Sequence, residues 1–583
     1  MVRVISLRKA ALAGVAGAVA MEVVFQLLRL AGLPAMDMVS ELSVTLFSRL
    51  HLLSIAGAGA IHLAIGVCWA VFYGFFFWAR WRWPPALQGL VFAAIPASLA
   101  ILIVYPQLRL MGIAGPLTVI RPETFLAPLS ASIVGSLAIG HAVFGLVMGA
   151  IYTRPVGYAA DSKPPRPAAP VALRRPQPRR RPDSGFMFAT GVECSYPTNE
   201  QGRWRRDELQ SADHYRFWQR DFALARELGI THIRYGPPLH LAFPAEGRFD
   251  WDYCDPQLAE LEQLGPEPII DLCHFGVPSW LGDLQNPAIV PALAAYAAAF
   301  AERYPWVRFY TPVNEMYVCA RMSTLEGLWN EQRRDEAAFV TATFNLARAS
   351  IAMSEEILKR RPDAVFVNSE SSEFHQPCCP DPAVQHKAEF ENERRFLALD
   401  LIYAHPLSDG MRRFLNGHGI ADSALAEFTS RDVPRRSILG IDYYEWNERL
   451  IDTRGDARAL GELFGWYVIA DQYNRRYKRP LMHTETNKMD SSGASRWLWR
   501  QWHNVQLLRH NGVPIVGFTW YSLTDQIDWS IAMSEPLGIV YPVGLFDLNR
   551  EVRTVGLSYK HLIDLYRCVP EYRDCPALAE MMG

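Results

Sequence analysis

The sequence predicts an α/β protein, a closed (β/α)8 or TIM barrel that follows an all-α domain of four transmembrane helices. Within residues 1–153 lie four apolar stretches, and each is long enough to cross a hydrocarbon layer of about 30 Å. From residue 185 onward, short β-rich runs alternate with helical patterns, and there are eight such runs. Regular alternation of strand and helix is typical of a parallel sheet, and eight units favour a closed barrel.

The overall composition agrees with two physically different regions. The chain has 583 residues, of which 50% are hydrophobic and only 20% are charged, and its formal net charge is -2. That length exceeds one ordinary domain. The near-neutral charge argues against nucleic acid as the main partner, because such binding needs a concentrated basic surface. None of the nine cysteines is in a Cys-x-x-Cys motif, so neither a disulfide framework nor a zinc ribbon is indicated.

The predicted membrane spans are residues 10–30, 53–79, 84–105 and 125–153. We expect the first span to remain in the mature protein, because three more spans follow it. Lysine and arginine are denser in the flanks that contain Lys9, Arg80 and Arg154 than in the opposite loops. The positive-inside rule therefore predicts an integral protein of the inner or plasma membrane, with both termini and everything after residue 153 on the cytoplasmic side.

Polar and small residues inside the spans allow two interpretations. Glu22, His62 and His141 would build either a proton or metal site or a set of interhelical hydrogen bonds, and the residues alone leave both open. Gly145 and Gly149 predict close contact between helices.

Residues 154–184 have the composition of a stiff linker, rich in proline, arginine and alanine. Next to a membrane, each arginine would be attracted to anionic headgroups by roughly 1 kcal/mol. A solvated linker whose charge only enforces topology is equally compatible. The predicted domains are thus residues 1–153 (membrane), 154–184 (linker) and 185–583 (barrel).

The predicted barrel strands are recognised by their last residues. They end at Ser195, Gly236, Phe275, Glu315, Glu370, Tyr444, Glu485 and Tyr521. Helices are expected at residues 212–228, 290–304, 336–361, 387–404, 457–477 and 495–510. A doubly wound open sheet is the alternative, but no glycine-rich phosphate loop follows any strand.

Acidic residues end the fourth and seventh predicted strands. Active residues of such barrels lie at the C-terminal ends of the strands, so Glu315 and Glu485 would face each other across the barrel mouth. Two carboxyl groups in one cleft are what cleavage of a glycosidic bond requires. Asn314 would donate to a sugar hydroxyl, and Arg234 would keep Glu485 ionised. Salt bridges at the barrel mouth are the alternative explanation of these charges.

Several motifs resemble glycoside hydrolase family 1, the β-glucosidase family of retaining barrel glycosidases. GITHIRYGPPL resembles that family's second strand with its arginine, and EPIIDLCHFGVPSWL its third. TPVNEMY is similar to the acid/base motif Thr-x-Asn-Glu-Pro, LGIDYYEWN to the Asn-Tyr-Tyr strand, and TETN to the nucleophile motif Thr-Glu-Asn-Gly. GFTWYSLTDQIDW resembles the aromatic motif of the eighth strand. The resemblance covers most of residues 185–565 and implies no metal and no organic cofactor.

The resemblance also implies roles for individual residues. Glu315 would be the general acid/base and Glu485 the nucleophile. Arg234 and Tyr444 would orient Glu485, and strand alternation favours Tyr444 over its neighbour Tyr443. The residues expected to contact the sugar are Asn314 at the 2-hydroxyl, His274, Trp529, Trp520, Asp528 and Glu193, the last in place of the family's glutamine.

The motifs depart from the family pattern at several positions. The proline after the acid/base is Met316, the glycine after the nucleophile motif is Lys488, and the asparagine of the sixth strand is Asp442. In the eighth strand Tyr521 replaces a tryptophan, with Trp520 one place earlier, and the sugar-binding glutamate is shortened to Asp528. The catalytic pair is present, while the residues expected to recognise the sugar differ.

The resulting hypothesis is a membrane-anchored O-glycosyl hydrolase that retains configuration and cleaves a β-linked carbohydrate or glycolipid at the cytoplasmic face. A transglycosylase with the same carboxyl pair is a second possibility, since the sequence does not separate water from other acceptors. A barrel that binds glycans or nucleotide sugars without turnover, as part of a membrane complex, is a third.

Overall fold

A computed structural model describes residues 7–33, 35, 39–40, 42–43, 52–77, 83–104, 131–152, 158–159, 185–199, 202, 204–264, 266–429 and 436–569. The chain divides into two compact units, Met1–Val156 and Gly157–Gly583. Nearly all of the predicted linker, residues 154–184, lies outside the described residues, as do the flanking charges Arg80 and Arg154. Each unit is therefore described by itself.

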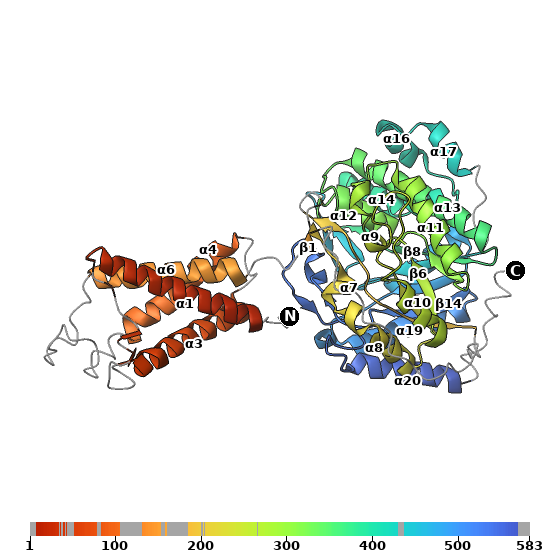
Figure 1. Cartoon of the computed structure of the whole chain (residues 1–583). Coiled ribbons are helices and arrows are strands. Elements are labelled where there is room, and N and C mark those ends of the chain that lie inside the picture. The colour runs from red at the N-terminus through yellow and green to blue at the C-terminus, as the bar shows by residue number, and fades with distance from the viewer. Residues whose placement is uncertain are drawn as a thin grey trace. The chain divides into compact units, whose positions relative to one another are not determined.

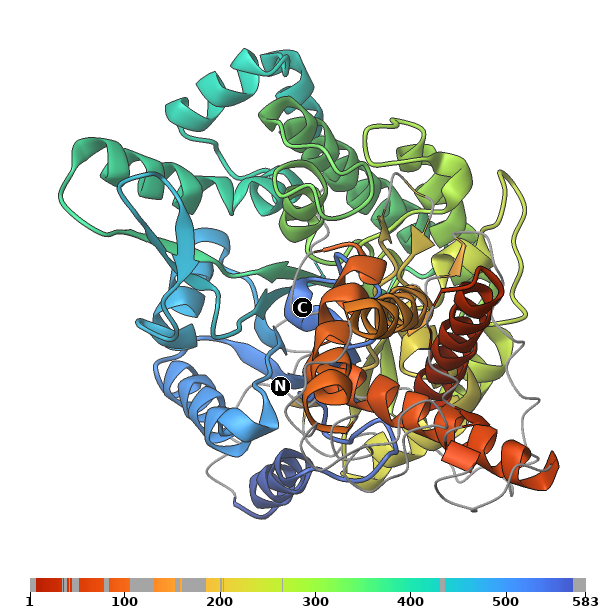
Figure 2. The same ribbon diagram turned by 90° about the vertical axis from the view of Figure 1, so that its left-hand side faces the viewer.

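The N-terminal unit contains the helices α1 (Leu7–Leu30), α3 (Leu52–Phe76), α4 (Pro85–Leu99) and α6 (Ala131–Tyr152), with the short π-helix η1 (Ala100–Val104) continuing α4. Four helices are long and apolar enough to cross a membrane, within Lys9–Leu30, Leu53–Gly74, Pro85–Ile103 and Val134–Tyr152. This agrees with the predicted all-α domain. The helices pack against one another as α1 with α3 and α6, and α4 with α6 (Figure 2).

Glycine allows the closest of these contacts. A Cβ atom added at Gly89 in α4 would lie 2.0 Å from the carbonyl oxygen of Gly145 in α6, a distance that no real side chain tolerates. Gly149 meets the same stretch of α4. The predicted close contact at Gly145 and Gly149 is confirmed, because small residues let two backbones approach.

Two of the polar residues in this unit form contacts within their own helices. Glu22 lies 3.6 Å from Arg29 and accepts a hydrogen bond of 3.3 Å from Gln26, all in α1. His141 Nδ1 lies 2.8 Å from the carbonyl oxygen of Leu137 in α6.

The second unit contains a closed barrel of eight parallel strands (Figure 1). Around the barrel the order is β10-β13-β14-β2-β5-β6-β7-β8, so every strand pairs with its neighbour along the chain and the last pairs with the first. The predicted α/β barrel is confirmed. The strands are β2 (Met187–Gly191), β5 (His232–Tyr235), β6 (Glu267–Asp271), β7 (Phe309–Thr311), β8 (Val365–Ser371), β10 (Ser437–Asp442), β13 (Leu481–Glu485) and β14 (Ile515–Tyr521).

Helices surround this barrel (Figure 1). The longer ones are α8 (His214–Glu227), α10 (Asp255–Leu264), α11 (Ile289–Arg303), α12 (Met316–Thr324), α13 (Glu336–Arg360), α14 (Pro382–Arg394), α16 (Asp409–Gly417), α17 (Asp422–Thr429), α18 (Gly465–Tyr477), α19 (Ala494–His510) and α20 (Thr554–Cys568). Shorter ones are α7 (Glu208–Ser211), α9 (Leu239–Ala242), α15 (Leu397–Ile402), η3 (Ser279–Leu281), η4 (Asp490–Ser492) and η5 (Trp529–Ile531).

Small sheets complete the loops. They consist of β1 (Tyr158–Ala159), β4 (Trp204–Arg205) and β3 (Thr198–Asn199); of β12 (Ala457–Ala459), β11 (Glu448–Ile451) and β9 (Phe374–Pro377); and of β15 (Gln526–Ile527) with β16 (Val540–Tyr541).

One predicted helix is wrong over its first eight residues, 457–464. Residues 457–477 were expected to be helical, but Ala457–Ala459 forms strand β12 and the helix α18 begins at Gly465. Gly461 and Gly465 have φ values of 80° and 74°. That left-handed conformation is incompatible with a continuous right-handed helix, so the two glycines end the strand and delay the helix.

The apolar residues form an inner and an outer core. Met187, Ile269, Phe309, Val367 and Met482 belong to a buried cluster contributed by the barrel strands. A larger cluster joins the other strand residues to the surrounding helices. Because strand residues alternate between these two faces, both must be apolar, which explains the continuous apolar runs of the sequence.

Tyr559 in α20 stabilises the junction between the first and last strands. Its buried hydroxyl lies 2.9 Å from the carbonyl oxygens of both Ala189 in β2 and Phe518 in β14. We predict that Tyr559→Phe lowers the free energy of unfolding by about 1–2 kcal/mol, because buried carbonyl groups lose a donor. Denaturation of the full chain in detergent measures this. Tyr467→Phe is the control: that hydroxyl interacts with Asn511 at the surface, and a change below about 0.5 kcal/mol is expected.

Candidate active site

A pocket opens at the C-terminal ends of the barrel strands, where such barrels carry their active residues. Its space, which is open to solvent, amounts to about 620 Å³, and both predicted catalytic acids line it. The lining residues are Glu193, His274, Phe275, Glu315, Val318, Arg321, Met322, Ser371, Glu373, Tyr444, Trp446, Asn447, Glu485, Asn487, Tyr521, Gln526, Trp529 and Tyr541.

The two acids lie in this pocket because each is at or just after the C-terminal end of a barrel strand. Glu485 is the last residue of β13, and Glu315 follows β7 by four residues, directly before α12. Glu315 has a φ of 41°, a left-handed conformation that is costly for a residue with a side chain. One carboxylate oxygen each from Glu315, Glu485 and Asp442 lies within 4.8 Å of the others. The fold therefore concentrates three acids that are far apart in the sequence.

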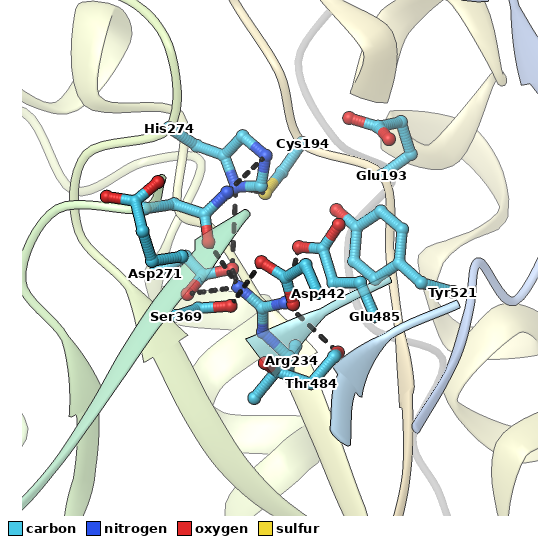
Figure 3. A network of polar contacts seen from close by, with 12 residues as sticks. Glu193, Cys194, Arg234, Asp271, His274, Ser369, Asp442, Thr484, Glu485 and Tyr521 are labelled. Atoms are coloured by element: carbon cyan, nitrogen blue, oxygen red, sulfur yellow. Dashed lines mark hydrogen bonds and ion pairs between the residues drawn. The ribbon is translucent and has the colours of Figure 1, made fainter. Parts of the chain in front are cut away.

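Arg234 organises the polar network around Glu485 (Figure 3). The buried guanidinium donates to Glu485, to the carbonyl oxygen of Thr484 at 3.2 Å, to Asp271 at 3.1 and 3.3 Å, and to Asn314 Oδ1 at 2.6 Å. The hydroxyl of Tyr444 donates to the other Glu485 oxygen at 2.7 Å. Both oxygens of Glu485 are thus held by donors.

The same cation acts on the protonation of its neighbour Asp271. Burial alone would raise the pKa of Asp271, but the charge of Arg234, with help from His274 and Thr311, lowers that pKa below its usual range. Asp271 is therefore a carboxylate at neutral pH.

Glu315 has the opposite environment. Burial raises the pKa of this carboxyl well above its usual value, and the negative charges of Asp442, Glu485 and Glu370 raise it further. Glu370 itself is buried, and that burial raises its pKa to about 8. Burial and neighbouring negative charges thus favour the protonated form of Glu315, whereas Glu485 accepts hydrogen bonds from a guanidinium and a phenol.

The predicted sugar contacts on the other side of the pocket include His274, Asn314, Glu193 and Trp529. Asn314 Nδ2 lies 3.2 Å from His274 Nε2, so these side chains support each other. Glu193 accepts hydrogen bonds from the backbone and hydroxyl of Ser195, at 2.9 and 2.5 Å. Glu193, His274 and Trp529 line the pocket. Asn314 is not among the lining residues, but it forms hydrogen bonds with Arg234 and His274.

Two of the residues predicted to contact the sugar lie outside the lining of this pocket. Trp520 is fully buried outside the pocket lining and donates its indole N–H to the carbonyl oxygen of Val543 at 2.9 Å. Successive strand residues point to opposite faces, so the adjacent Tyr521 lines the pocket instead. Asp528 also lies outside the lining: it bonds Arg206 at 3.2 Å and the backbone N–H of Ile539 at 2.7 Å.

Sequence reasoning missed several pocket residues. Gln526 donates to Glu193 at 2.8 Å, and it could have been found by its place in the matched eighth-strand motif. Arg321 and Glu373 line the pocket as an ion pair of 2.9 Å. No sequence motif contains both residues. Arg321 lies in α12 and Glu373 follows the end of β8, and these segments meet only in the folded chain.

Metal-ligating atoms gather in two places among the described residues. One group is Glu315, Asp442 and Glu485, and the other is Cys194, Asp271 and His274. Arg234 bonds an acid of each group, so a cation would compete with a fixed guanidinium. His274 Nδ1 is occupied as well, at 3.3 Å from Cys194 Sγ.

The profile of Glycosyl hydrolase family 1 matches residues 194–447. Residues 194–447 are thus similar to glycosyl hydrolase family 1. Beta-glucosidase A of Thermotoga maritima is 22% identical over 400 residues, which cover 60% of this chain and 86% of the relative. The 1,4-beta-D-glucan glucohydrolase of Thermotoga neapolitana is 21% identical over 404 residues, with 60% and 87% covered.

Solved structures agree with the barrel fold. The family 1 β-glucosidase from Thermotoga maritima superposes with a TM-score of 0.56 at 17% identity, covering 67% of this chain and 98% of that one. The same enzyme in complex with noeuromycin gives 0.57. The structural likeness shows the barrel fold, and the family match with the curated relatives supports O-glycosyl hydrolase activity.

We predict that Arg234→Met lowers the free energy of unfolding at pH 7 by about 3–5 kcal/mol, because Asp271 and Glu485 would be left buried without their cation. Denaturation of the full chain in detergent measures the loss. The deficit should shrink in acid: a carboxyl with a lowered pKa contributes stability above its unfolded pKa and loses it as the pH falls.

The control for this prediction is Arg303→Met. Arg303 pairs with Asp255 at 2.5 Å on the surface, where both side chains are 43% exposed. A loss below about 1 kcal/mol is expected there. An equally small loss for Arg234→Met would show that the buried network does not depend on the guanidinium.

Proposed function

We propose that the barrel, residues 185–583, is a retaining β-glycosidase in which Glu315 is the general acid/base and Glu485 the nucleophile. The observation that carries this proposal is the contrast between the two acids in one pocket. Burial and neighbouring negative charges favour the protonated form of Glu315, while Arg234 and Tyr444 donate to Glu485. Two carboxyl groups with opposed protonation are what the reaction uses.

The spacing supports retention of configuration. Inverting enzymes keep their carboxyl groups about 6.5–9.5 Å apart to admit a water molecule, whereas retaining enzymes keep them about 5–5.5 Å apart. Here the oxygens of Glu315 and Glu485 approach within 4.8 Å. This approach is closer to the separation of retaining enzymes than to that of inverting enzymes.

In the first step, Glu315 gives its proton to the glycosidic oxygen as the bond from that oxygen to the anomeric carbon breaks. Glu485 attacks the same carbon from the other face and forms a glycosyl ester. Arg234 and Tyr444 hold the two oxygens of Glu485 in the attacking orientation.

In the second step, water attacks the ester and Glu315 accepts a proton. Glu485 loses its negative charge when the ester forms, which removes one of the charges that raise the pKa of Glu315. Glu315 therefore acts as a base in the second step, after it has given up its proton in the first. Release of the sugar restores both starting forms.

The remaining pocket residues suit recognition of a sugar. Asn314, fixed by Arg234 and His274, is proposed to bind the 2-hydroxyl. Trp529 and Tyr521 offer aromatic surface, and Glu193 with Gln526 offers hydrogen-bonding groups. The substrate is thus proposed to be a β-linked carbohydrate or glycolipid.

We also propose that the four apolar helices anchor the enzyme in the membrane, with residues 154–184 as linker and the barrel in the cytoplasm. The helices are long and apolar enough to cross a bilayer. Lysine and arginine around the spans support the orientation.

A 2-deoxy-2-fluoro glycosyl fluoride tests the nucleophile. Its fluorine slows both steps, while the fluoride leaving group lets the ester form without protonation. We expect mass spectrometry of the digested full chain to find the label on Glu485, with none on Glu485→Gln. A label on another residue, or none from a broad panel of sugars, would contradict the assignment.

Glu315→Ala supplies the matched control. This variant should still accept the label at Glu485, because fluoride leaves unaided. Hydrolysis of an alkyl glycoside should fall by about 100-fold or more, as expected when a general acid is removed. Equal losses for activated and unactivated leaving groups would exclude Glu315 as the acid. Adding an alcohol acceptor in the same assay separates hydrolysis from transglycosylation by the products.

A C-terminal reporter tests the orientation. A phosphatase that folds only in the periplasm should be inactive when fused after Gly583, while a fluorescent protein that folds in the cytoplasm should be bright. The reverse pattern would place the barrel on the opposite side of the membrane.

A further inference from the structure

Asp442 is an acid where the related motif has asparagine, and it lies inside the candidate site. It ends β10 and pairs in register with Glu485 on β13. The side chain is completely buried. Its Oδ2 accepts a hydrogen bond of 2.7 Å from the Ser369 hydroxyl, while its Oδ1 has no hydrogen-bond partner among the described residues. Figure 3 shows Asp442 next to Glu485.

The charges around Asp442 do not balance if every acid is ionised. Four buried acids, Asp271, Glu485, Asp442 and Glu315, lie close together, and the cationic groups beside them are the guanidinium of Arg234 and the imidazole of His274. Buried like charges at this spacing prevent neighbouring carboxyl groups from ionising together, so at least one proton stays in the cluster.

We propose that Asp442 is a positioning residue of this site: Asp442 and Glu315 hold one proton between them, and the negative charge of Asp442 keeps that proton on Glu315. The inference rests on the proposed role of Glu315 as the acid. It assigns a function to a residue that the catalytic pair leaves unexplained.

The location of the proton follows from the donors. Asp442 accepts a hydrogen bond from the Ser369 hydroxyl and lies near Arg234, and both favour its ionised form. Glu315 receives no hydrogen bond at its carboxyl from any described residue. Burial raises the pKa of both acids. At Asp442 the cation and the hydroxyl donor oppose that rise, whereas at Glu315 the charge of Asp442 adds to it.

The other charged groups do not replace Asp442. The groups that face Glu315 are Asp442, Glu485, Glu370 and His274, and those that face Asp442 are Glu485, Arg234, Tyr444, Thr484 and Ser369. Glu485 loses its charge when the glycosyl ester forms. Asp442 takes part in no bond change, so its charge acts on Glu315 in both steps.

Asp442→Asn tests the proposal, because the amide removes the charge and still accepts from Ser369. Glu315 is the acid below its pKa, and kcat/KM falls as the pH rises through that pKa. We expect the alkaline limb of the profile to move about one pH unit or more to lower pH, so that kcat/KM above the limb falls about tenfold. An unchanged limb would overturn the proposal.

Asp456→Asn is the matched control, since Asp456 is exposed on the surface, and its profile should coincide with that of the original chain. A merely structural role of Asp442 would lower kcat/KM at every pH without moving the limb. That outcome would also refute the proposal.

A titration without substrate separates this proposal from the proposed function. Infrared spectra of the full chain in detergent contain a band from protonated carboxyl groups, and subtracting the Glu315→Gln spectrum isolates Glu315. We expect that band to vanish at lower pH in Asp442→Asn than in the original chain. Identical titrations would refute the role of Asp442 even if the chain hydrolyses glycosides, and shifted titrations would support it even if no glycoside is cleaved.

Discussion

The buried guanidinium of Arg234 is the interaction on which the site depends. It projects from the second strand of the barrel and bonds groups from the third, fourth and seventh. Each of those groups is buried, and a buried carboxylate without a cation is strongly unfavourable. Arg234 therefore makes it possible to keep Asp271 and Glu485 charged in the interior, and through Asn314 it also orients His274.

One cation among several acids has a second consequence. Arg234 contacts Asp271 and lowers the pKa of that carboxyl below its usual range. Glu315 and Glu370 have no contact with the guanidinium among the described residues, and burial raises the pKa of both. The protonation of these acids thus depends on their distance from one cation as well as on residue type.

Most departures from the family motifs lie around this network, but Asp442 lies inside it. Tyr521 lines the pocket at the end of the last strand, Asp528 bonds Arg206, and Lys488, three residues after β13, bonds Glu445 at 2.5 Å. The Arg321–Glu373 ion pair forms part of the pocket wall. The two carboxyl groups proposed as the catalytic pair are present, while several residues around them differ from the family motifs.

The amino-acid sequence by itself determined the two fold classes, the number of barrel strands and the chain positions of the paired acids. Apolar runs and their period are local properties of the sequence, so they predict where the strands lie. Because active residues of such barrels lie at the C-terminal ends of the strands, the predicted strand ends also indicate the site. The sequence pattern misjudged residues 457–464, where two glycines with positive φ interrupt a helical pattern. Only the tertiary structure decided that Asp271 and Asp442 join Arg234 and Glu485, and that Arg321 pairs with Glu373. Those contacts join strands that are far apart in the chain, and the closure of the barrel, which no local pattern encodes, brings them within bonding distance.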